Sequence, residues 1–320
     1  MAAQPGYLLG PLAEHLVLPP SAGSRHHLGV GPLHVDVCKV CHGAAAPGTT
    51  LCGDCAQRRQ EVPEPTGLVV PITLYRHGPS AVDSVLYDYK SLLKGPQGRD
   101  DANQARWQLT ALLACFLNAH HTCIDRGIGG RWDAITIVPP TLTAPRDGST
   151  HPLARIIDRL DQVHLPTRQG RRAWTNRRLD VLAPGPDAPL LAKQQASQDG
   201  FVVQHPERVR RRRLLLVDDL LISGAHLQSA ASALATAGAT VAAVVVGRRL
   251  NVRQEYPRRL WDQLRREQAD WRKAQRASST GQRTLGDPRL AERQALAYFA
   301  SCCLEDPRPH QPGLDVAIDP

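Results

Sequence analysis

One segment constrains the fold of this chain more than any other, the run Leu214–Gly224 with the sequence LLLVDDLLISG. Its apolar residues lead into the adjacent acids Asp218 and Asp219. A short turn then opens the small-residue segment AHLQSAASALATAG, which is followed by TVAAVVVG. An apolar run, a helix of small residues and a second β-branched run predict a βαβ unit in a buried parallel sheet.

The two acids are expected where open parallel sheets bind ligands, beyond the carboxyl ends of the strands. The turn after them leads into a helix N-terminus, whose free N–H groups and dipole favour a phosphate. Carboxylates that accept hydrogen bonds from ribose hydroxyls, beside a turn that grips a phosphate, suit a sugar phosphate as the ligand.

A second interpretation has the acids capping the next helix or coordinating a metal at a nucleotide-hydrolysing site. Such a site normally needs a GxxxxGK[ST] motif, and the chain contains none. A dinucleotide-binding fold is unsupported as well. No GxGxxG motif follows a predicted strand, and Gly127, Gly129 and Gly130 lie in a polar turn. The sugar-phosphate interpretation is preferred, since acid pair, turn, helix and strand agree in their order.

The segment resembles the phosphoribosyl pyrophosphate (PRPP) motif of type I phosphoribosyltransferases, apolar-apolar-Val-Asp-Asp-x-x-Thr-Thr-Gly-x-Thr. Here Ile222 and Ser223 replace two threonines, and His226 replaces the third. The resemblance implies that Asp218 and Asp219 hold the ribose hydroxyls of PRPP. The loop that it implies around the 5′-phosphate consists of Leu220, Leu221, Ile222, Ser223, Gly224, Ala225, His226 and Leu227.

A second motif lies near the other end of the chain, where Cys38, Cys41, Cys52 and Cys55 form CxxC–x10–CxxC. Two such pairs match a closed tetrahedral zinc site of structural type. The alternative is two disulfides, which suit a secreted chain. The first residues, MAAQPGYLLG, lack the basic segment and long apolar core of a secretion signal, so zinc is expected. His34 and His42 are expected to be bystanders.

A cysteine ribbon followed by a PRPP motif is similar to the ComF family, the competence-associated, amidophosphoribosyltransferase-like proteins of bacteria. The resemblance covers approximately Val37 to Leu250 and includes the segments Tyr87–Lys90 and Ile135–Pro140. Where the family has an Arg-Gly-x-Asn element facing pyrophosphate, this chain has PRDGSTH, so the resemblance assigns the pyrophosphate contact to Arg146.

The resemblance implies a type I phosphoribosyltransferase fold, a parallel sheet flanked by helices, with an N-terminal zinc ribbon of four cysteines. The implied activity is that of a glycosyltransferase of the pentosyl class: Mg²⁺-dependent transfer of phosphoribose to a nitrogen nucleophile, with release of pyrophosphate. The acceptor is not identified. The alternative is a non-catalytic accessory protein that binds PRPP or a nucleotide and serves DNA uptake.

The expected organisation has four parts. Within the third part, the resemblance implies that residues 165–200 form a flexible cover over the active site. Strands are predicted at Leu68–Leu74 and Trp132–Val138, and helices at Asn103–Ala119 and Leu153–Leu160. The parts are a loosely ordered lead-in at 1–35, the zinc ribbon at 36–62, the phosphoribosyltransferase domain at 67–255 and a helical C-terminal extension at 256–320.

Charge and composition add expectations about partners. The formal net charge of +9 favours anionic partners, PRPP or a nucleic acid. The basic run Arg208 and Arg210–Arg213 is interpreted as solvated charge or as a path for phosphate or nucleic acid. Only 4% of the residues are aromatic, so few side chains are available to stack on the bases of single-stranded DNA. The extension after Tyr256 is a packed tail helix or a partner surface.

Location follows from apolar runs and cysteines. No run approaches the roughly 18 apolar residues that a membrane span needs, so no membrane insertion is expected. Eight cysteines in a chain without an export signal predict a reducing cytoplasm. The pair Cys302 and Cys303 is interpreted as incidental, with a ribbon ligand or a redox-sensitive pair as alternatives.

Overall fold

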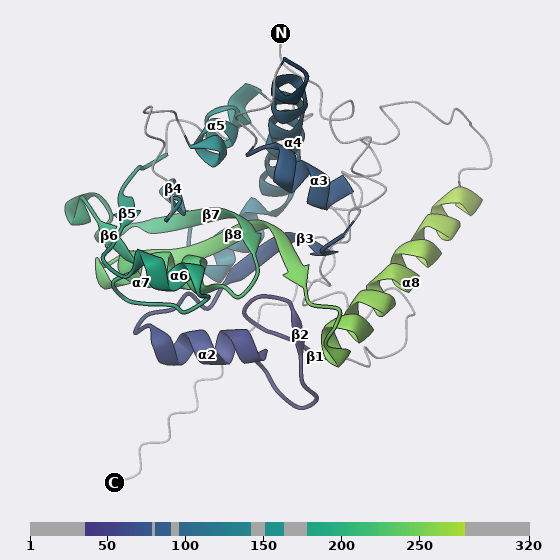
Figure 1. Cartoon of the computed structure of the whole chain (residues 1–320), viewed down its shortest axis with the longest axis horizontal. Coiled ribbons are helices and arrows are strands. Elements are labelled where there is room, and N and C mark those ends of the chain that lie inside the picture. The colour runs from purple at the N-terminus through teal and green to yellow at the C-terminus, as the bar shows by residue number, and fades with distance from the viewer. Residues whose placement is uncertain (1–35, 79–80, 91–95, 142–150, 163–177, 279–320) are drawn as a thin grey trace.

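The computed structural model describes residues 36–78, 81–90, 96–141, 151–162 and 178–278, which fold as an α/β protein (Figure 1). The elements in chain order are β1 (Asp36–Val37), β2 (Ala44–Ala45), α2 (Gly53–Glu61), β3 (Val69–Arg76), α3 (Ala81–Asp88), α4 (Pro96–Gly127), β4 (Ala134–Ile137), α5 (Pro152–Asp158), η2 (Leu160–Gln162), β5 (Leu182–Pro184), α6 (Ala188–Ala192), β6 (Phe201–Val203), η4 (Pro206–Arg208), β7 (Arg213–Leu221), α7 (Ala225–Thr236), β8 (Thr240–Leu250) and α8 (Glu255–Ser278).

A four-stranded parallel sheet in the order β3-β8-β7-β4 forms the centre of the molecule. The two inner strands, β7 and β8, are joined through α7 and pair side by side, which confirms the predicted βαβ unit. Leu214 to Val217 are fully buried. Their continuous apolar character, rather than an alternation, fits a strand that is covered on both faces.

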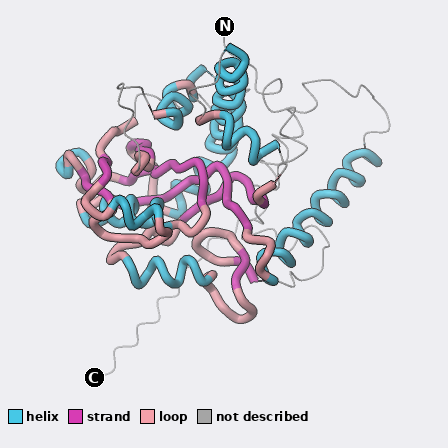
Figure 2. The backbone as a smooth tube through the Cα atoms, viewed as in Figure 1, coloured by secondary structure: helices cyan, strands magenta, loops and turns pink. Residues whose placement is uncertain are grey.

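Helices cover both faces of the sheet (Figures 1 and 2). On one face α3, α4 and α5 pack against alternate residues of β7 and β8, such as Leu215 and Val244. On the other face α7, α6 and the cysteine-bearing segment pack against the intervening residues, such as Leu216 and Val245. This alternation places two different environments on the two sides of the same strands.

Helix α4 is longer than predicted. Apolar periodicity predicts only Asn103–Ala119, whereas the helix extends over Pro96–Gly127. Its first turns are polar and its last turns carry buried residues such as Ile124 among polar ones. Cys115 is buried in the middle of this helix.

The stretch expected to cover the site differs in its second half. Residues 163–177 lie outside the described part of the chain, but β5 and β6 pair antiparallel and enclose α6. Val181, Leu191 and Phe201 are buried in the core cluster that also contains α7. This half is therefore part of the packed core and not a mobile cover, because its apolar side chains are buried against the sheet-flanking helix.

The described part of α8 packs through one stripe. Leu260 and Leu264 are buried against Leu74 of β3 and Leu250 of β8. Figure 1 shows the helix leaving the body of the molecule toward its far end. The predicted lead-in at 1–35 and the pair Cys302–Cys303 lie outside the described residues.

Candidate functional site

The acid pair lies near the carboxyl end of an inner strand. Asp218 and Asp219 belong to β7 and are buried, with 9% and 7% of their surface exposed. The backbone N–H of Asp219 donates to Asp218 Oδ1 at 2.9 Å. The acids are expected beyond the strand end, but Asp218 pairs with Val245 of β8 and the strand continues to Leu221, so the pair lies within the last four residues of β7.

Two neighbours of Asp219 come from the segment after α3. The Tyr89 hydroxyl donates a hydrogen bond to Asp219 Oδ2, and the Lys90 ammonium forms an ion pair with the same oxygen. Tyr89 is fully buried and its carbonyl accepts from Arg106 Nε at 3.0 Å, whereas the Lys90 side chain is 53% exposed. The sequence shows the Tyr-Lys pair but gives no reason to place it on Asp219.

These neighbours make the two acids unequal. Burial and the adjacent Asp219 carboxylate raise the pKa of Asp218 well above its usual range. Burial also acts to raise the pKa of Asp219, but Lys90 and the hydroxyl of Tyr89 hold it below the ordinary value. At neutral pH the pair therefore carries its charge mainly on Asp219, which accepts hydrogen bonds only.

The loop that the resemblance assigns to the 5′-phosphate is shorter than Leu220–Leu227. Leu220 and Leu221 pair with Gly247 and Arg248 of β8, so they belong to the strand. The turn consists of Ile222, Ser223 and Gly224, and Ala225 begins α7. We call Ile222–Gly224 the phosphate loop from here on.

Gly224 sets the shape of this loop. It adopts φ +80° at the N-cap of α7, a left-handed conformation that costs other residues strain. Ser223 Oγ accepts from the N–H of Ala225 at 3.4 Å, and the carbonyl of Gly224 accepts from the N–H of Gln228 at 2.9 Å. The loop thus brings the chain into α7 with the first N–H groups of the helix at the sheet edge.

His226 has a partner that the sequence did not indicate. Its Nε2 lies 3.1 Å from Thr141 Oγ1, in the turn after β4. Burial lowers the pKa of His226, so the ring is neutral at pH 7. The residue that replaces the last threonine of the motif therefore connects α7 with the turn from which the pyrophosphate segment starts.

The pyrophosphate segment itself, including Arg146, falls within residues 142–150, outside the described part of the chain. The first described residue after it is His151, the N-cap of α5, whose Nδ1 accepts from the N–H of Leu153 at 3.2 Å. Burial lowers the pKa of His151, and both Asp219 and Lys90 influence it. His151 therefore lies near the acid pair, a position that the sequence alone does not reveal.

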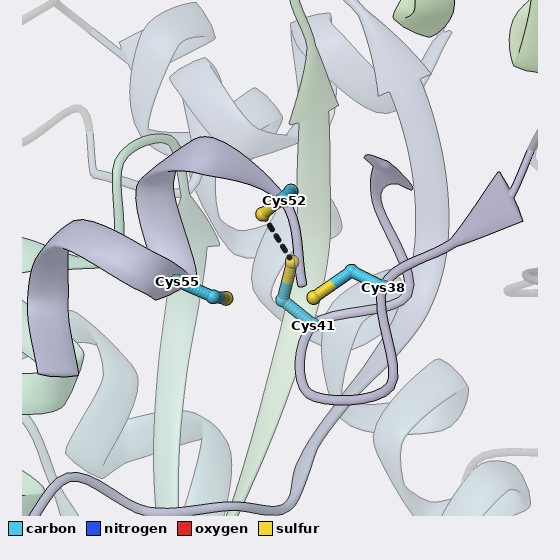
Figure 3. A group of neighbouring side chains, drawn as sticks. All are labelled: Cys38, Cys41, Cys52 and Cys55. Atoms are coloured by element: carbon cyan, nitrogen blue, oxygen red, sulfur yellow. Dashed lines mark hydrogen bonds between the residues drawn. The ribbon is translucent and has the colours of Figure 1, made fainter. Parts of the chain in front are cut away.

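The four predicted zinc ligands come together. Cys38, Cys41, Cys52 and Cys55 are buried and their Sγ atoms all lie within 4.8 Å of one another (Figure 3). Cys38 and Cys41 stand on the loop between β1 and β2, while Cys52 and Cys55 start α2. Among the described residues, no histidine joins this group.

The cluster fits zinc. Cys41 Sγ and Cys52 Sγ are 3.6 Å apart, close to the ~3.8 Å edge of a tetrahedron with Zn–S bonds of about 2.3 Å. The separation is too long for a disulfide, whose sulfurs lie about 2.05 Å apart. A closed set of four thiolates leaves no open position for a substrate, so its role is structural.

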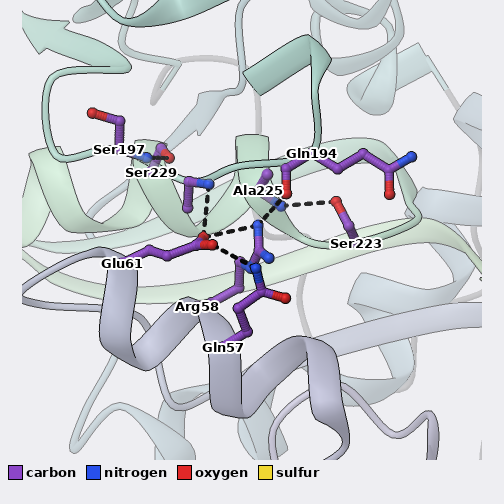
Figure 4. Close-up of polar contacts among 9 residues, drawn as sticks. Gln57, Arg58, Glu61, Gln194, Ser197, Ser223, Ala225 and Ser229 are labelled. Atoms are coloured by element: carbon purple, nitrogen blue, oxygen red, sulfur yellow. Dashed lines mark hydrogen bonds and ion pairs between the residues drawn. The ribbon is translucent and has the colours of Figure 1, made fainter. Parts of the chain in front are cut away.

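Helix α2, which begins at the cluster, is held against the segment around Gln194 by polar contacts of its side chains (Figure 4). Arg58 is 3% exposed, donates to the carbonyl of Gln194 and forms an ion pair with Glu61 at 2.9 Å. Glu61 in turn accepts from the N–H of Ala196 at 2.8 Å. The ribbon is therefore fastened to the segment before β6 by charge-assisted hydrogen bonds.

The basic run lies away from this site. Arg208 and Arg210–Arg212 are exposed and precede β7, whereas the acid pair lies near its other end. The rise of a strand puts about 20 Å between Arg213 and Asp219. The run thus does not line the phosphate loop, which leaves solvated charge or a separate contact surface.

For magnesium the suitable donor here is the ionised carboxylate of Asp219, because carboxylate oxygens are among its preferred protein ligands. In the part of the chain that the structure describes, no helix is long and apolar enough to cross a membrane. No protein-family model matches the chain, and no curated protein matches it.

Proposed function

We propose that the protein binds PRPP with Mg²⁺ and transfers its phosphoribosyl group to a nitrogen nucleophile, as ComF-like and other type I phosphoribosyltransferases do. One observation carries the proposal. A buried acid pair near the carboxyl end of the inner strand β7 directly precedes a loop with a left-handed glycine that opens α7. This arrangement supplies acceptors for ribose hydroxyls and donors for a phosphate from one continuous segment.

The residues divide the work by their charge. Asp219, the ionised member of the pair, accepts a hydrogen bond from a ribose hydroxyl. Asp218, the member with the raised pKa, holds Asp219 in place through its contact with the Asp219 N–H. The N–H groups at the start of α7 donate to the 5′-phosphate, and Ser223 adds a hydroxyl.

Lys90 has a role that its exposure makes accessible. In the ligand-free protein it neutralises Asp219, and half of its side chain remains in solvent. When a ribose hydroxyl takes its place, its ammonium is free to pair with a pyrophosphate oxygen. The Lys90 charge, with Arg146, then stabilises the leaving group as the bond from C1 to pyrophosphate breaks and C1 becomes oxocarbenium-like. Bound Mg²⁺ would supply further positive charge to the pyrophosphate oxygens.

A second candidate function rests on His226. Its ring occupies the position of the last motif threonine and is hydrogen-bonded to Thr141, so it fills part of the space beside the loop. This observation favours a protein that binds PRPP or a nucleotide without turnover, serving DNA uptake.

The experiment that tests the proposal is calorimetric titration of PRPP with Mg²⁺, with pyrophosphate release followed in parallel. The samples are the wild type, the double variant Asp218→Asn/Asp219→Asn, and the matched control Asp262→Asn on the exposed surface of α8. Binding lost only in the double variant, with release when ammonia or a base is added, supports the transferase. Binding without release for any acceptor supports the second function, and no wild-type binding contradicts both.

A further inference from the structure

The cysteine cluster and the phosphate loop are neighbours in space although the sequence separates them by about 170 residues. A small cavity lies between them, lined by Cys41 and Cys55 on one side, Ser223 and Gly224 on the other, and Arg58 and Arg248. It leaves ≈ 10 Å³ for the centre of a water molecule, so at most about one water fits. The two sites therefore meet through side chains rather than through bulk solvent.

Arg248 joins the two sites directly. It is 5% exposed on β8, its Nη1 donates to the carbonyl of Ile222 in the phosphate loop, and its Nη2 donates to Asp54 Oδ2 at 3.2 Å. A Cβ added to Gly43 would lie 3.1 Å from this guanidinium and 3.4 Å from Cys41 Sγ. Only the absence of a side chain at position 43 lets the guanidinium approach the knuckle.

The junction also has polar atoms without partners. Among the described residues, Arg248 Nε, Arg58 Nε and Gln228 Oε1 are buried and make no hydrogen bond, and all three residues line the cavity. An unpartnered buried donor is costly unless charge compensates it. A water in this cavity or the sulfur atoms of the cluster can accept from the two arginine donors, whereas Gln228 Oε1 needs a donor.

The position of the anion that pairs with Arg248 depends on the metal. Asp54 lies between Cys52 and Cys55 at the start of α2, so a metal bound by these cysteines fixes the segment that carries it. A buried guanidinium needs a nearby anion. Without the metal this segment is no longer cross-linked to Cys38 and Cys41, and the Asp54 side chain, which is 47% exposed, loses that restraint.

We infer that the metal-loaded cysteine cluster holds the phosphate loop in its binding shape through Arg248, so that loss of the metal loosens the loop and weakens phosphate binding. The inference rests on the proposed function in assigning Ile222–Gly224 to the phosphate. It assigns Arg248 as a positioning residue: the metal-bound knuckle holds Asp54, Asp54 holds the guanidinium, and the guanidinium holds the carbonyl of Ile222.

Hydrogen–deuterium exchange of the full chain tests this coupling. The reporter is a peptide that contains the N–H groups of Ala225 and Gln228, which bond to the loop; a peptide from β4 reports on the rest of the sheet. The samples are zinc-loaded wild type, wild type after chelation, Arg248→Met, and Arg259→Met, which removes an exposed arginine from α8. Exchange in the reporter is expected to rise tenfold or more after chelation and in Arg248→Met, with β4 and the control unchanged.

Titration of PRPP with Mg²⁺ into the same samples is expected to show affinity at least tenfold weaker for Arg248→Met, while metal analysis still finds zinc. Unchanged exchange in the reporter after chelation overturns the inference. So does a rise that spreads equally to β4, because the cluster would then support the whole domain. If Arg248→Met does not fold, the chelated wild type decides. Failure of the wild type to bind PRPP contradicts the proposed function, yet the exchange comparison still decides the coupling.

Discussion

The acid pair and the cysteine cluster both concentrate negative charge in the interior, but their counter-charges differ in exposure. Asp219 is paired with Lys90, whose side chain is 53% exposed, whereas the cluster faces Arg248, whose side chain is only 7% exposed. A solvated lysine can leave and return at small cost. A buried arginine cannot, because separation would leave a desolvated charge. The difference teaches that the first region is built to exchange partners and the second to keep them.

The largest effect on stability is expected from disrupting the cysteine cluster. Cys52→Ser removes one of the four zinc ligands and is expected to lower the free energy of unfolding by about 4 kcal/mol. Chemical denaturation with zinc analysis measures this change. Cys123→Ser, at an exposed cysteine of α4, is the control and should change stability by less than about 0.5 kcal/mol. Equal losses in both variants would contradict a structural zinc site.

A substitution in the acid pair, by contrast, is expected to raise the free energy of unfolding. Asp218→Asn removes a buried acid whose raised pKa disfavours ionisation. A raised native pKa gives stability that is present at low pH and is lost as pH rises through that pKa. The variant should therefore be more stable than the wild type at pH 7 by about 1 kcal/mol, and this gap should close as pH falls toward the unfolded pKa of about 3.9.

Because the variant keeps an Oδ1 acceptor for the Asp219 N–H, its PRPP binding should weaken by less than about tenfold, equivalent to about 1.4 kcal/mol. Thermal denaturation across pH and calorimetry measure the two effects. Stability lost together with affinity would show that Asp218 serves the fold rather than the ligand.

The loop between the two regions offers a smaller test. Gly224→Ala places a Cβ on a residue with φ +80° and is expected to cost about 1 kcal/mol of stability. Because the loop shapes the phosphate site, affinity for PRPP should fall more than stability alone explains. Gly67→Ala, where an added Cβ meets nothing within 4 Å, is the matched control. Calorimetry and thermal denaturation of both variants separate the two contributions.

The smallest effect concerns pH. Burial lowers the pKa of His226, so its native state resists protonation. The stability that it contributes is complete above the unfolded pKa of about 6.5 and is lost as pH falls through the lower native value. Comparing the wild type with His226→Gln between pH 7.5 and 5.5 should reveal a flatter profile in the variant, by less than about 1 kcal/mol. Identical profiles would place His226 in solvent.

Local patterns predict much of this molecule for identifiable reasons. The apolar runs of β7 and β8 fix a buried parallel pair because both faces are covered, and the CxxC pairs fix the cluster because four cysteines at that spacing suit one metal. The loop that the resemblance implies, Leu220–Leu227, is wrong at its start, because Leu220 and Leu221 pair with β8 and stay in the sheet.

The remaining features depend on tertiary contacts that no local pattern records. Tyr89 and Lys90 follow α3 and reach Asp219 across 130 residues, and Arg248 reaches the cluster from the far end of β8. The resemblance implies a flexible cover at residues 165–200. In the described part from Leu182 to Val203, a few apolar side chains nevertheless suffice to bury the segment against α7. Arg146 stays a prediction.

The arginines of residues 208–212 precede β7, whereas the acid pair lies near its other end. This separation has a consequence for how two anionic ligands would bind. A polyanion attracted to the arginines would lie along the amino-terminal rim of the sheet, on the side away from the site proposed for a sugar phosphate. The polyanion and the sugar phosphate would then not compete for the same space or for the same positive charges. Salt would weaken the long polymer strongly and the buried small ligand far less, so ionic strength would select which of them stays bound.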